Sequence, residues 1–237
     1  MAEPAVVTDR SSVQTADGRL VCDAGTGLRQ LRSRLRLQPG RTLVGIDGVL
    51  GSGRHTFADE LAVLLAECGI ETVRASFDDH LNPSAIRYAR GSASPRGFYE
   101  DTYDYGAFND DVLEPLSREG SGRDRPTAYD HTLNAPTRPL WQIAPENCVA
   151  IIDGTFLHSS RFCTDGKDKP WDVSVWLDVP LEEAYRRLHE RLGVNPDPHH
   201  PDNTGSYQGQ QLYLAECDPA SKADLVVDNT DRHPAID

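Results

Sequence analysis

Residues 48–56 combine a glycine-rich turn with side chains that can carry phosphate or metal chemistry. They read GVLGSGRHT and follow the spacing G-x-x-x-x-G-K-[ST], between an apolar strand pattern (TLVGID) and a helical run (FADELAVLLAECG). In such a setting, backbone N–H groups and the helix N-terminus form a cradle for anions. The pattern predicts a phosphate-binding loop, although a plain glycine-rich turn before a helix would look the same. The predicted binding residues are Gly48, Gly51, Ser52, Gly53, Arg54, His55 and Thr56.

Two positions of this loop differ from the pattern. Arg54 stands where the pattern has lysine, and it replaces a compact ammonium with a larger planar fork. His55 stands where a hydroxyl would bind Mg²⁺, and imidazole nitrogen matches that oxygen-preferring ion poorly. Thr56 offers a hydroxyl one position later. The loop therefore predicts nucleotide-dependent phosphoryl transfer and also raises the question of whether transfer still occurs.

Acidic residues follow two further strand patterns. Asp78 and Asp79 follow residues 71–76 after a single phenylalanine, and transfer to an alcohol needs a carboxylate beside the attacking hydroxyl. Asp153 ends the apolar run CVAIID, a pattern typical of a strand whose acid holds Mg²⁺. The alternatives are a helix-capping or turn aspartate at position 78 and an ordinary strand-end aspartate at position 153.

Arginines follow at a helical spacing. Arg187 and Arg191 are four residues apart in LEEAYRRLHER and so share one helix face. They can neutralise charge on a transferred phosphoryl group. A solvated face that pairs with Glu182, Glu183 and Glu190 is the alternative.

Strand and helix patterns alternate along most of the chain. This order predicts an α/β fold, a mainly parallel sheet with helices on both faces, whose ligands bind at the carboxyl ends of the strands. The predicted strands are 42–47, 71–76, 148–153, 173–178 and 224–228. The predicted helices are 25–37, 53–67, 106–116, 181–191 and 207–216.

Length and composition limit the class of protein. The chain has 237 residues, and we expect a polar segment over 1–24 followed by one domain over 25–237 with a lid near 192–206. A net charge of −13 argues against general binding to nucleic acid or anionic membrane. Five dispersed cysteines, no leader pattern and no long apolar run predict a cytoplasmic protein with reduced thiols.

The segment after Asp78 carries a family resemblance. The ordered matches are Asp78-Asp79, Pro83, Arg87-Tyr88, Arg90-Gly91, Ser94-Pro95, Gly97-Phe98-Tyr99, Tyr103-Asp104-Tyr105, Ala107-Phe108 and Leu113-Glu114-Pro115-Leu116. With the loop and with Asp153-Gly154 in order, the chain resembles the uridine kinase-like P-loop kinases over about residues 40–230. The resemblance implies a three-layer sandwich around a central five-stranded sheet, with a short lid. Related kinases form dimers or tetramers, although nothing in the sequence identifies an interface.

The resemblance also implies an activity and roles for particular residues. The activity is phosphorylation of the 5′-hydroxyl of uridine or cytidine by ATP or GTP with Mg²⁺. Asp78 would be the catalytic base, Arg187 and Arg191 would face the phosphates, and Thr56 and Asp153 would lie at the metal. The expected substrate-binding residues are Asp79, Arg87, Tyr99, Asp104 and Tyr129.

Departures from the family pattern cluster at the phosphate and acceptor positions. Besides Arg54 and His55, His80 and Leu81 replace the aromatic and histidine that follow the paired acids. Two alternatives therefore stand beside an active nucleoside kinase. One is an inactive or weakened pseudokinase that binds nucleotide or ligand, and the other is a kinase for another metabolite, such as a pantothenate-like alcohol.

Overall fold

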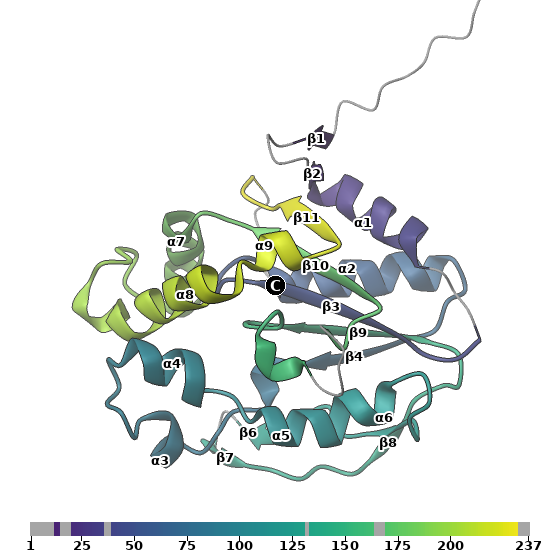
Figure 1. Cartoon of the computed structure of the whole chain (residues 1–237), viewed down its shortest axis with the longest axis horizontal. Helices are drawn as coiled ribbons and strands as arrows, with labels where there is room; N and C mark the ends of the chain where they lie inside the picture. Colours follow the sequence, from purple (N-terminus) through teal and green to yellow (C-terminus); the bar gives the residue numbers. More distant parts are fainter. Residues whose placement is uncertain (1–11, 15–19, 36–38, 131–132, 164–168, 232–237) are drawn as a thin grey trace, which may run out of the picture.

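A seven-stranded sheet forms the centre of the computed structural model (Figure 1). The structure describes residues 12–14, 20–35, 39–130, 133–163 and 169–231. The strand order is β1-β2-β11-β10-β3-β9-β4, and every neighbouring pair except β1 and β2 is parallel. The predicted α/β fold with a mainly parallel sheet is confirmed. The carboxyl ends of β3, β9 and β4 meet at one edge, where Asp153 is in register with Ile46 and Ser76.

All five predicted strands are present, and the sheet is wider than expected. The strands of the main sheet are β1 (Ser12–Gln14), β2 (Leu20–Asp23), β3 (Thr42–Gly48), β4 (Thr72–Ser76), β9 (Val149–Gly154), β10 (Val173–Asp178) and β11 (Leu225–Asp228). The five predicted strands do not include β1 and β2. These two strands are short and lie in a polar part of the sequence that carries little strand pattern. Two small antiparallel pairs join β5 (Arg123–Asp124) to β8 (Gln142–Ile143) and β6 (Tyr129–Asp130) to β7 (Ala135–Pro136).

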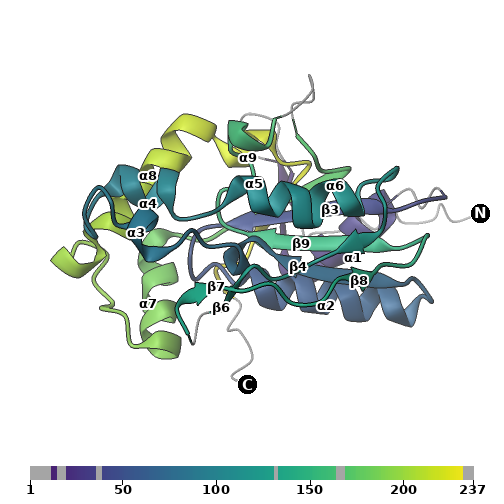
Figure 2. The ribbon, with the colours of Figure 1, turned by 90° about the horizontal axis from the view of Figure 1, so that it is seen from below.

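Helices cover both faces of the sheet, which gives three layers (Figure 2). On one face lie α1 (Ala24–Arg34) and α2 (Arg54–Glu67). The opposite face carries a nearly continuous helical stretch made of α5 (Tyr105–Phe108), a π-helical turn (Asn109–Leu113) and α6 (Glu114–Leu116). The remaining helices are α3 (Ser84–Arg87), α4 (Pro95–Asp101), α7 (Leu181–Leu192), α8 (Thr204–Cys217) and α9 (Pro219–Lys222). Every predicted helix is found, although residues 36 and 37 of the predicted helix 25–37 lie outside the described residues. The helices α3 and α4 were not among those predicted.

Local signals explain where the helices begin. The side chain of Asp23 accepts a hydrogen bond from the backbone of Thr26 at 2.9 Å and caps α1. Ser94 caps α4 in the same way through Gly97 at 3.1 Å, and Pro95 occupies the first helical position. The predicted lid, 192–206, spans the end of α7, a 3₁₀ turn (Pro201–Asn203) and the start of α8.

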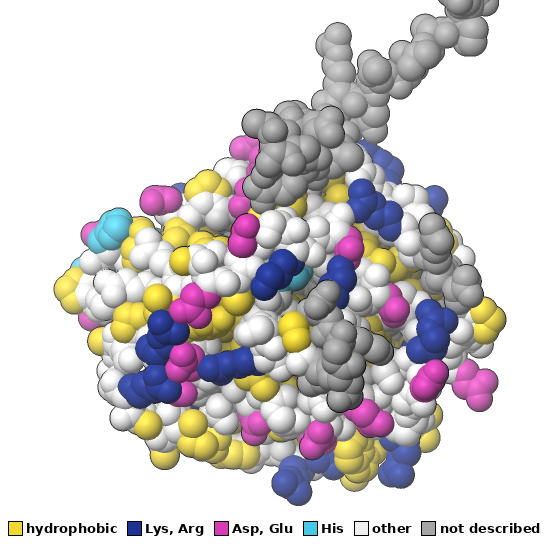
Figure 3. All heavy atoms as spheres, in the orientation of Figure 1, with side chains coloured by type: hydrophobic (Ala, Val, Ile, Leu, Met, Phe, Trp, Pro, Cys, Tyr) yellow, Lys and Arg dark blue, Asp and Glu magenta, His cyan; other side chains and the backbone are white. Residues whose placement is uncertain are grey.

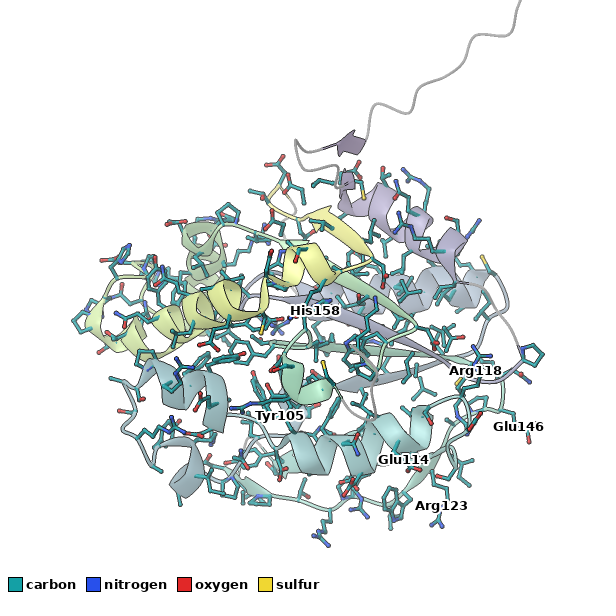
Figure 4. The ribbon with its side chains drawn as sticks, viewed as in Figure 1. Tyr105, Glu114, Arg118, Arg123, Glu146 and His158 are labelled. Atoms are coloured by element: carbon teal, nitrogen blue, oxygen red, sulfur yellow. The ribbon has the colours of Figure 1, made fainter. Side chains whose placement is uncertain are left out.

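Two hydrophobic cores lie on opposite faces of the sheet. The core beneath α1 and α2 includes Leu31, Phe57 and Leu61, all fully or almost fully buried. The opposite core is aromatic: Phe77, directly after β4, packs against Tyr105 of α5 with ring centroids 4.9 Å apart. Figure 4 labels Tyr105 on α5 and also His158, which comes from the turn after β9. The aromatic core therefore ties the segment after Asp78 to the sheet edge.

Charge is spread over the visible surface. In Figure 3 basic and acidic side chains are interspersed rather than gathered into one broad patch. Within the described part of the chain, helices long and apolar enough to cross a membrane are absent.

Candidate active site

The glycine-rich loop leaves the end of β3 and enters α2 with strained backbone that glycine accommodates. Gly51 and Gly53 have φ of 79° and 87°, a region that L side chains rarely adopt. A Cβ atom at Gly51 would overlap the carbonyl oxygen of Ala184 on α7. The backbone conformation and the packing of α7 therefore both require glycine at position 51.

Side chains from elsewhere in the chain hold this loop in place. Asn229, after β11, donates through Nδ2 to the carbonyl of Ser52 at 2.7 Å. Gln210 on α8 accepts from the backbone N–H of Leu50 at 2.6 Å. These contacts join the loop to two distant segments and fix its shape before any ligand binds.

Arg54 turns inward from the first turn of α2. Its Nη1 donates to the carbonyl of Gly48 at 2.6 Å and to the hydroxyl of Thr155, and its Nη2 lies 2.9 Å from Oδ2 of Asp78. Only 8% of its side chain is exposed. Burial alone would lower the Arg54 pKa, but the neighbouring charges, chiefly Asp78, outweigh it and raise that pKa. Arg54 is therefore a fixed cation that connects the loop to the predicted catalytic carboxylate.

Asp78 lies in a 3₁₀ turn (Phe77–Asp79) at the end of β4, with both carboxylate oxygens engaged. Arg54 contacts Oδ2, and the Tyr103 hydroxyl donates to Oδ1 at 2.9 Å. The residue that caps this turn is Ser76, whose hydroxyl accepts from the backbone of Asp78 at 3.3 Å. Asp78 therefore does not cap the turn, and its side chain, 35% exposed, lies at the cavity.

Asp153, at the end of β9, is almost fully buried and lies between an arginine and a histidine. Arg74 of β4 donates to Oδ1 at 2.9 Å, and the hydroxyl of Ser76 donates to Oδ2 at 3.1 Å. Nδ1 of His55 lies 3.4 Å from Oδ2. Burial acts to raise the Asp153 pKa, but the His55 hydrogen bond and the Arg74 charge outweigh burial and lower it. The same hydrogen bond raises the pKa of His55.

One cavity of about 310 Å³ brings the predicted groups together. Its lining includes residues of the loop and of the first turn of α2, three aspartates, and two arginines of α7. These residues are Gly51, Gly53, Arg54, His55, Thr56, Asp78, Asp79, Asp153, Arg187 and Arg191. Residues from four separate parts of the chain therefore converge where parallel α/β sheets bind ligands.

The arginines of α7 differ in which sequence interpretation they fit, a solvated charged face or a group that faces phosphates. Arg186 pairs with Glu183 and Glu190, as a solvated charged face would. Arg187 is buried and donates to Glu183 and to the carbonyls of Asn229 and Thr230. Its Nη1 lacks a hydrogen-bond partner among the described residues, and the side chain lines the cavity. Arg187 is thus placed to meet an anion in the cavity.

The comparisons with known proteins agree with this geometry. Dephospho-CoA kinase of Corynebacterium glutamicum is 30% identical over 173 residues, which cover 65% of this chain and 74% of that protein. Nicotinamide riboside kinase 1 of Mus musculus is 28% identical over 162 residues, or 67% of this chain and 70% of that protein. The solved structure of a possible uridine kinase from Bacillus stearothermophilus matches in fold with a TM-score of 0.66 and 23% identity, over 86% of this chain and 98% of that one. No protein-family model matches the sequence.

This chain belongs to the P-loop kinases. Within that family, its loop backbone keeps the expected strand–loop–helix arrangement, whereas the lysine and hydroxyl positions carry Arg54 and His55.

The residues that the sequence predicted for a metal ion, Thr56 and Asp153, form an unusual donor set. Mg²⁺ takes oxygen ligands in near-ideal octahedral geometry. Both oxygens of Asp153 already accept from protein groups, and the neighbouring position carries an imidazole. Thr56 lines the cavity together with Asp153. A guanidinium already paired with the carboxylate, and an imidazole where the pattern has a hydroxyl, make this donor set a poor fit for Mg²⁺.

The predicted substrate residues of the kinase lie in different places. Asp79 lines the cavity. Arg87 donates to the Tyr129 hydroxyl and to Oδ1 of Asn134, both at 2.9 Å, and these residues lie outside the cavity lining. Tyr99 lies in the aromatic core with its hydroxyl 3.1 Å from Cys217 Sγ, and Asp104 caps α5. The substrate roles of these residues remain predictions.

Several residues that shape the site of this kinase were not predicted from the sequence. Tyr103 and Thr155 contact the Asp78–Arg54 pair, and Arg74 contacts Asp153. The signal for Arg74 was available, because an arginine inside a predicted buried strand needs an acidic partner. Which acid it meets depends on the order of the strands.

Proposed function

We propose that the protein is a nucleotide-dependent phosphotransferase that acts on a hydroxyl of a nucleoside or a similar small alcohol. The observation that carries this proposal is the single cavity shared by the phosphate loop, Asp78 and the α7 arginines. Phosphoryl transfer depends mainly on positioning and charge neutralisation, and this cavity supplies groups for both.

The loop end of the cavity is suited to the phosphates of ATP or GTP. Backbone N–H groups of the loop and the N-terminus of α2 favour anions. The buried Arg187 offers an unpartnered nitrogen at the same cavity, and Arg191 lines it as well. These side chains would neutralise charge that develops on the transferred group.

The opposite end of the cavity is suited to the acceptor. Asp78 would orient the attacking hydroxyl and accept its proton, while Arg54 and Tyr103 fix the position of its carboxylate. The mouse relative is named for a riboside, which agrees with the nucleoside class that the sequence resemblance implies. Uridine and cytidine remain the first acceptors to test.

The test is a transfer assay read by mass spectrometry. Purified protein is incubated with ATP or GTP and a panel of uridine, cytidine, nicotinamide riboside, dephospho-CoA and pantothenate, in parallel with Mg²⁺ and with EDTA. A phosphorylated product is expected, and Asp78→Asn should abolish it while nucleotide affinity stays near that of the unmodified protein. Asp110→Asn, on the exposed π-helical turn, is the matched control and should keep full turnover. Unchanged turnover in Asp78→Asn would remove Asp78 from the role of base.

A second function, nucleotide binding without turnover, is favoured by the Arg54–Asp78 ion pair. A carboxylate whose two oxygens are already engaged by a guanidinium and a phenol has fewer free lone pairs for the substrate hydroxyl. If this function is correct, the unmodified protein binds nucleotide but gives no product. Arg54→Lys combined with His55→Ser should then restore turnover if the loop is the only defect. A product from the unmodified protein rules this function out.

A further inference from the structure

A cluster of five polar side chains lies at the end of β9, and three of them, His55, Ser76 and Asp153, line the cavity. Arg74 lies at its centre, and its Nη1 donates to Asp153 at 2.9 Å and to the carbonyl of Ile151 at 3.1 Å. From α2, Asp59 accepts from Nε at 3.1 Å and lies 3.0 Å from Nη2. His55 and Ser76 complete the contacts to Asp153. The guanidinium is therefore held by two carboxylates and a backbone carbonyl, with only 22% of the side chain exposed.

This arrangement gives the buried acid a permanent counter-charge. The Asp153 side chain is 2% exposed, and an isolated carboxylate at such a site would be strongly unfavourable. A divalent cation is one solution to that problem, and a guanidinium fixed by a second acid is another. Arg74 supplies the second solution from within the fold, because β4 and β9 are neighbours and place Arg74 opposite Ile151 in register.

We propose that Arg74 and His55 occupy the place of a metal ion beside Asp153, so that this site binds nucleotide phosphates without Mg²⁺. The proposal rests on the nucleotide site proposed above and gives it a property that the family resemblance does not imply. The charges that neutralise the phosphates then come from fixed groups, namely Arg187, Arg191 and the loop backbone. A Mg²⁺ ion at Oδ1 of Asp153 would lie beside the Arg74 guanidinium, which Asp59 holds in place, and the two cations would repel each other.

The test compares nucleotide affinity with and without metal. Binding of a non-hydrolysable ATP analogue and a GTP analogue is measured by calorimetry in Mg²⁺ and in EDTA. The unmodified protein should show dissociation constants within about twofold of each other, well short of the 10- to 100-fold changes typical when a metal site is disturbed. A loss of about tenfold or more in EDTA would overturn the proposal. This comparison uses the unmodified protein, so it does not depend on any variant folding.

A double variant tests whether the site becomes metal-dependent when the cluster is removed. Arg74→Gln with His55→Ser removes both basic partners of Asp153 and places a hydroxyl at position 55. Its nucleotide affinity should become metal-dependent by about 10- to 100-fold. Arg90→Gln is the matched control, because Arg90 forms ion pairs with Glu100 and Asp101 outside the cavity lining and should leave the metal ratio unchanged. A folded double variant that stays metal-independent counts against the proposal.

Direct binding of Mn²⁺ to the protein alone, followed by electron paramagnetic resonance, separates this proposal from the proposed function. If neither form binds nucleotide, the proposed function fails, and the Mn²⁺ result still decides the role of Arg74. Mn²⁺ bound by the double variant but not by the unmodified protein supports the proposal. Mn²⁺ bound by the unmodified protein and lost in Asp153→Asn, or bound by neither form, overturns it.

Discussion

Two groups of residues lie at the cavity. We call the loop of residues 48–53 the backbone wall, and we call Arg54, His55, Asp78 and Asp153 together the side-chain wall. The backbone wall keeps the arrangement expected of a phosphate loop, and its contacts come from Asn229, Gln210 and α7. In the side-chain wall each altered residue meets an acid, since Arg54 pairs with Asp78 and His55 approaches Asp153. Anion binding by main-chain groups tolerates changes of side chain, whereas a changed cation needs a matching acid nearby.

The largest expected effect on the free energy of unfolding comes from a substitution in the backbone wall. Gly51→Ala places a Cβ atom against the carbonyl of Ala184 and forces a side chain into positive φ, so we expect a loss of about 3–5 kcal/mol in the free energy of unfolding. Gly69→Ala is the matched control, with φ of 73° and open space within 4 Å. It should lose only about 1 kcal/mol, the strain alone. Urea denaturation measures both, and equal losses would show that packing of α7 on the loop is unimportant.

A smaller effect is expected when the side-chain wall loses its fixed cation. Arg54→Met should cost about 2–3 kcal/mol of unfolding free energy, at the lower end for a buried pair because Asp78 is partly exposed. Asp78→Asn in the Arg54→Met background should cost less than in the unmodified protein. A double-mutant cycle by chemical denaturation should therefore give a coupling energy of about 1 kcal/mol or more. Additive losses would mean that the two residues stabilise the protein independently.

The contact between Asn229 and the loop tests how far the backbone wall depends on side chains. Asn229→Ala removes the donor to the Ser52 carbonyl in a buried setting, and we expect a loss of about 1–2 kcal/mol with weaker nucleotide binding. Asn147→Ala is the control, since it removes a comparable bond to Gly40 at an exposed position. Calorimetry should show unchanged nucleotide affinity for the control. The same loss of affinity in both variants would contradict a local role for Asn229.

The smallest expected effect is a pH dependence of stability that arises from His80, a buried residue. Burial lowers the pKa of His80, although the Ser76 carbonyl, 3.3 Å from Nδ1, acts in the opposite direction. The unfolded chain takes up a proton on His80 below about pH 6.5, while the folded chain resists it. His80 should therefore contribute a loss of stability as pH decreases from about 7 to 5, opposite in sign to the contribution of His55, and His80→Phe should lose less stability over this range than the unmodified protein. Identical slopes in urea denaturation at each pH would contradict the shift.

The sequence by itself determined the elements and their order. Apolar runs and glycine positions are local signals, so the five central strands, the main helices and the phosphate loop were all predictable. The sequence also placed Asp78, Asp153 and the loop at one edge of the sheet, because carboxyl ends of parallel strands meet there. The short strands β1 and β2 were missed, since they depend on pairing with β11 and with each other rather than on pattern.

Only the tertiary structure decided which charges meet. The sequence shows Arg54, Arg74, Asp78 and Asp153 but not that Arg54 reaches Asp78 while Arg74 reaches Asp153. Those pairings depend on the strand order β3-β9-β4 and on side-chain directions within a few ångströms. The energy of a buried ion pair changes steeply over such distances, and residue spacing along the chain does not encode them. The chemistry of the altered loop is therefore set by partners more than 20 residues away.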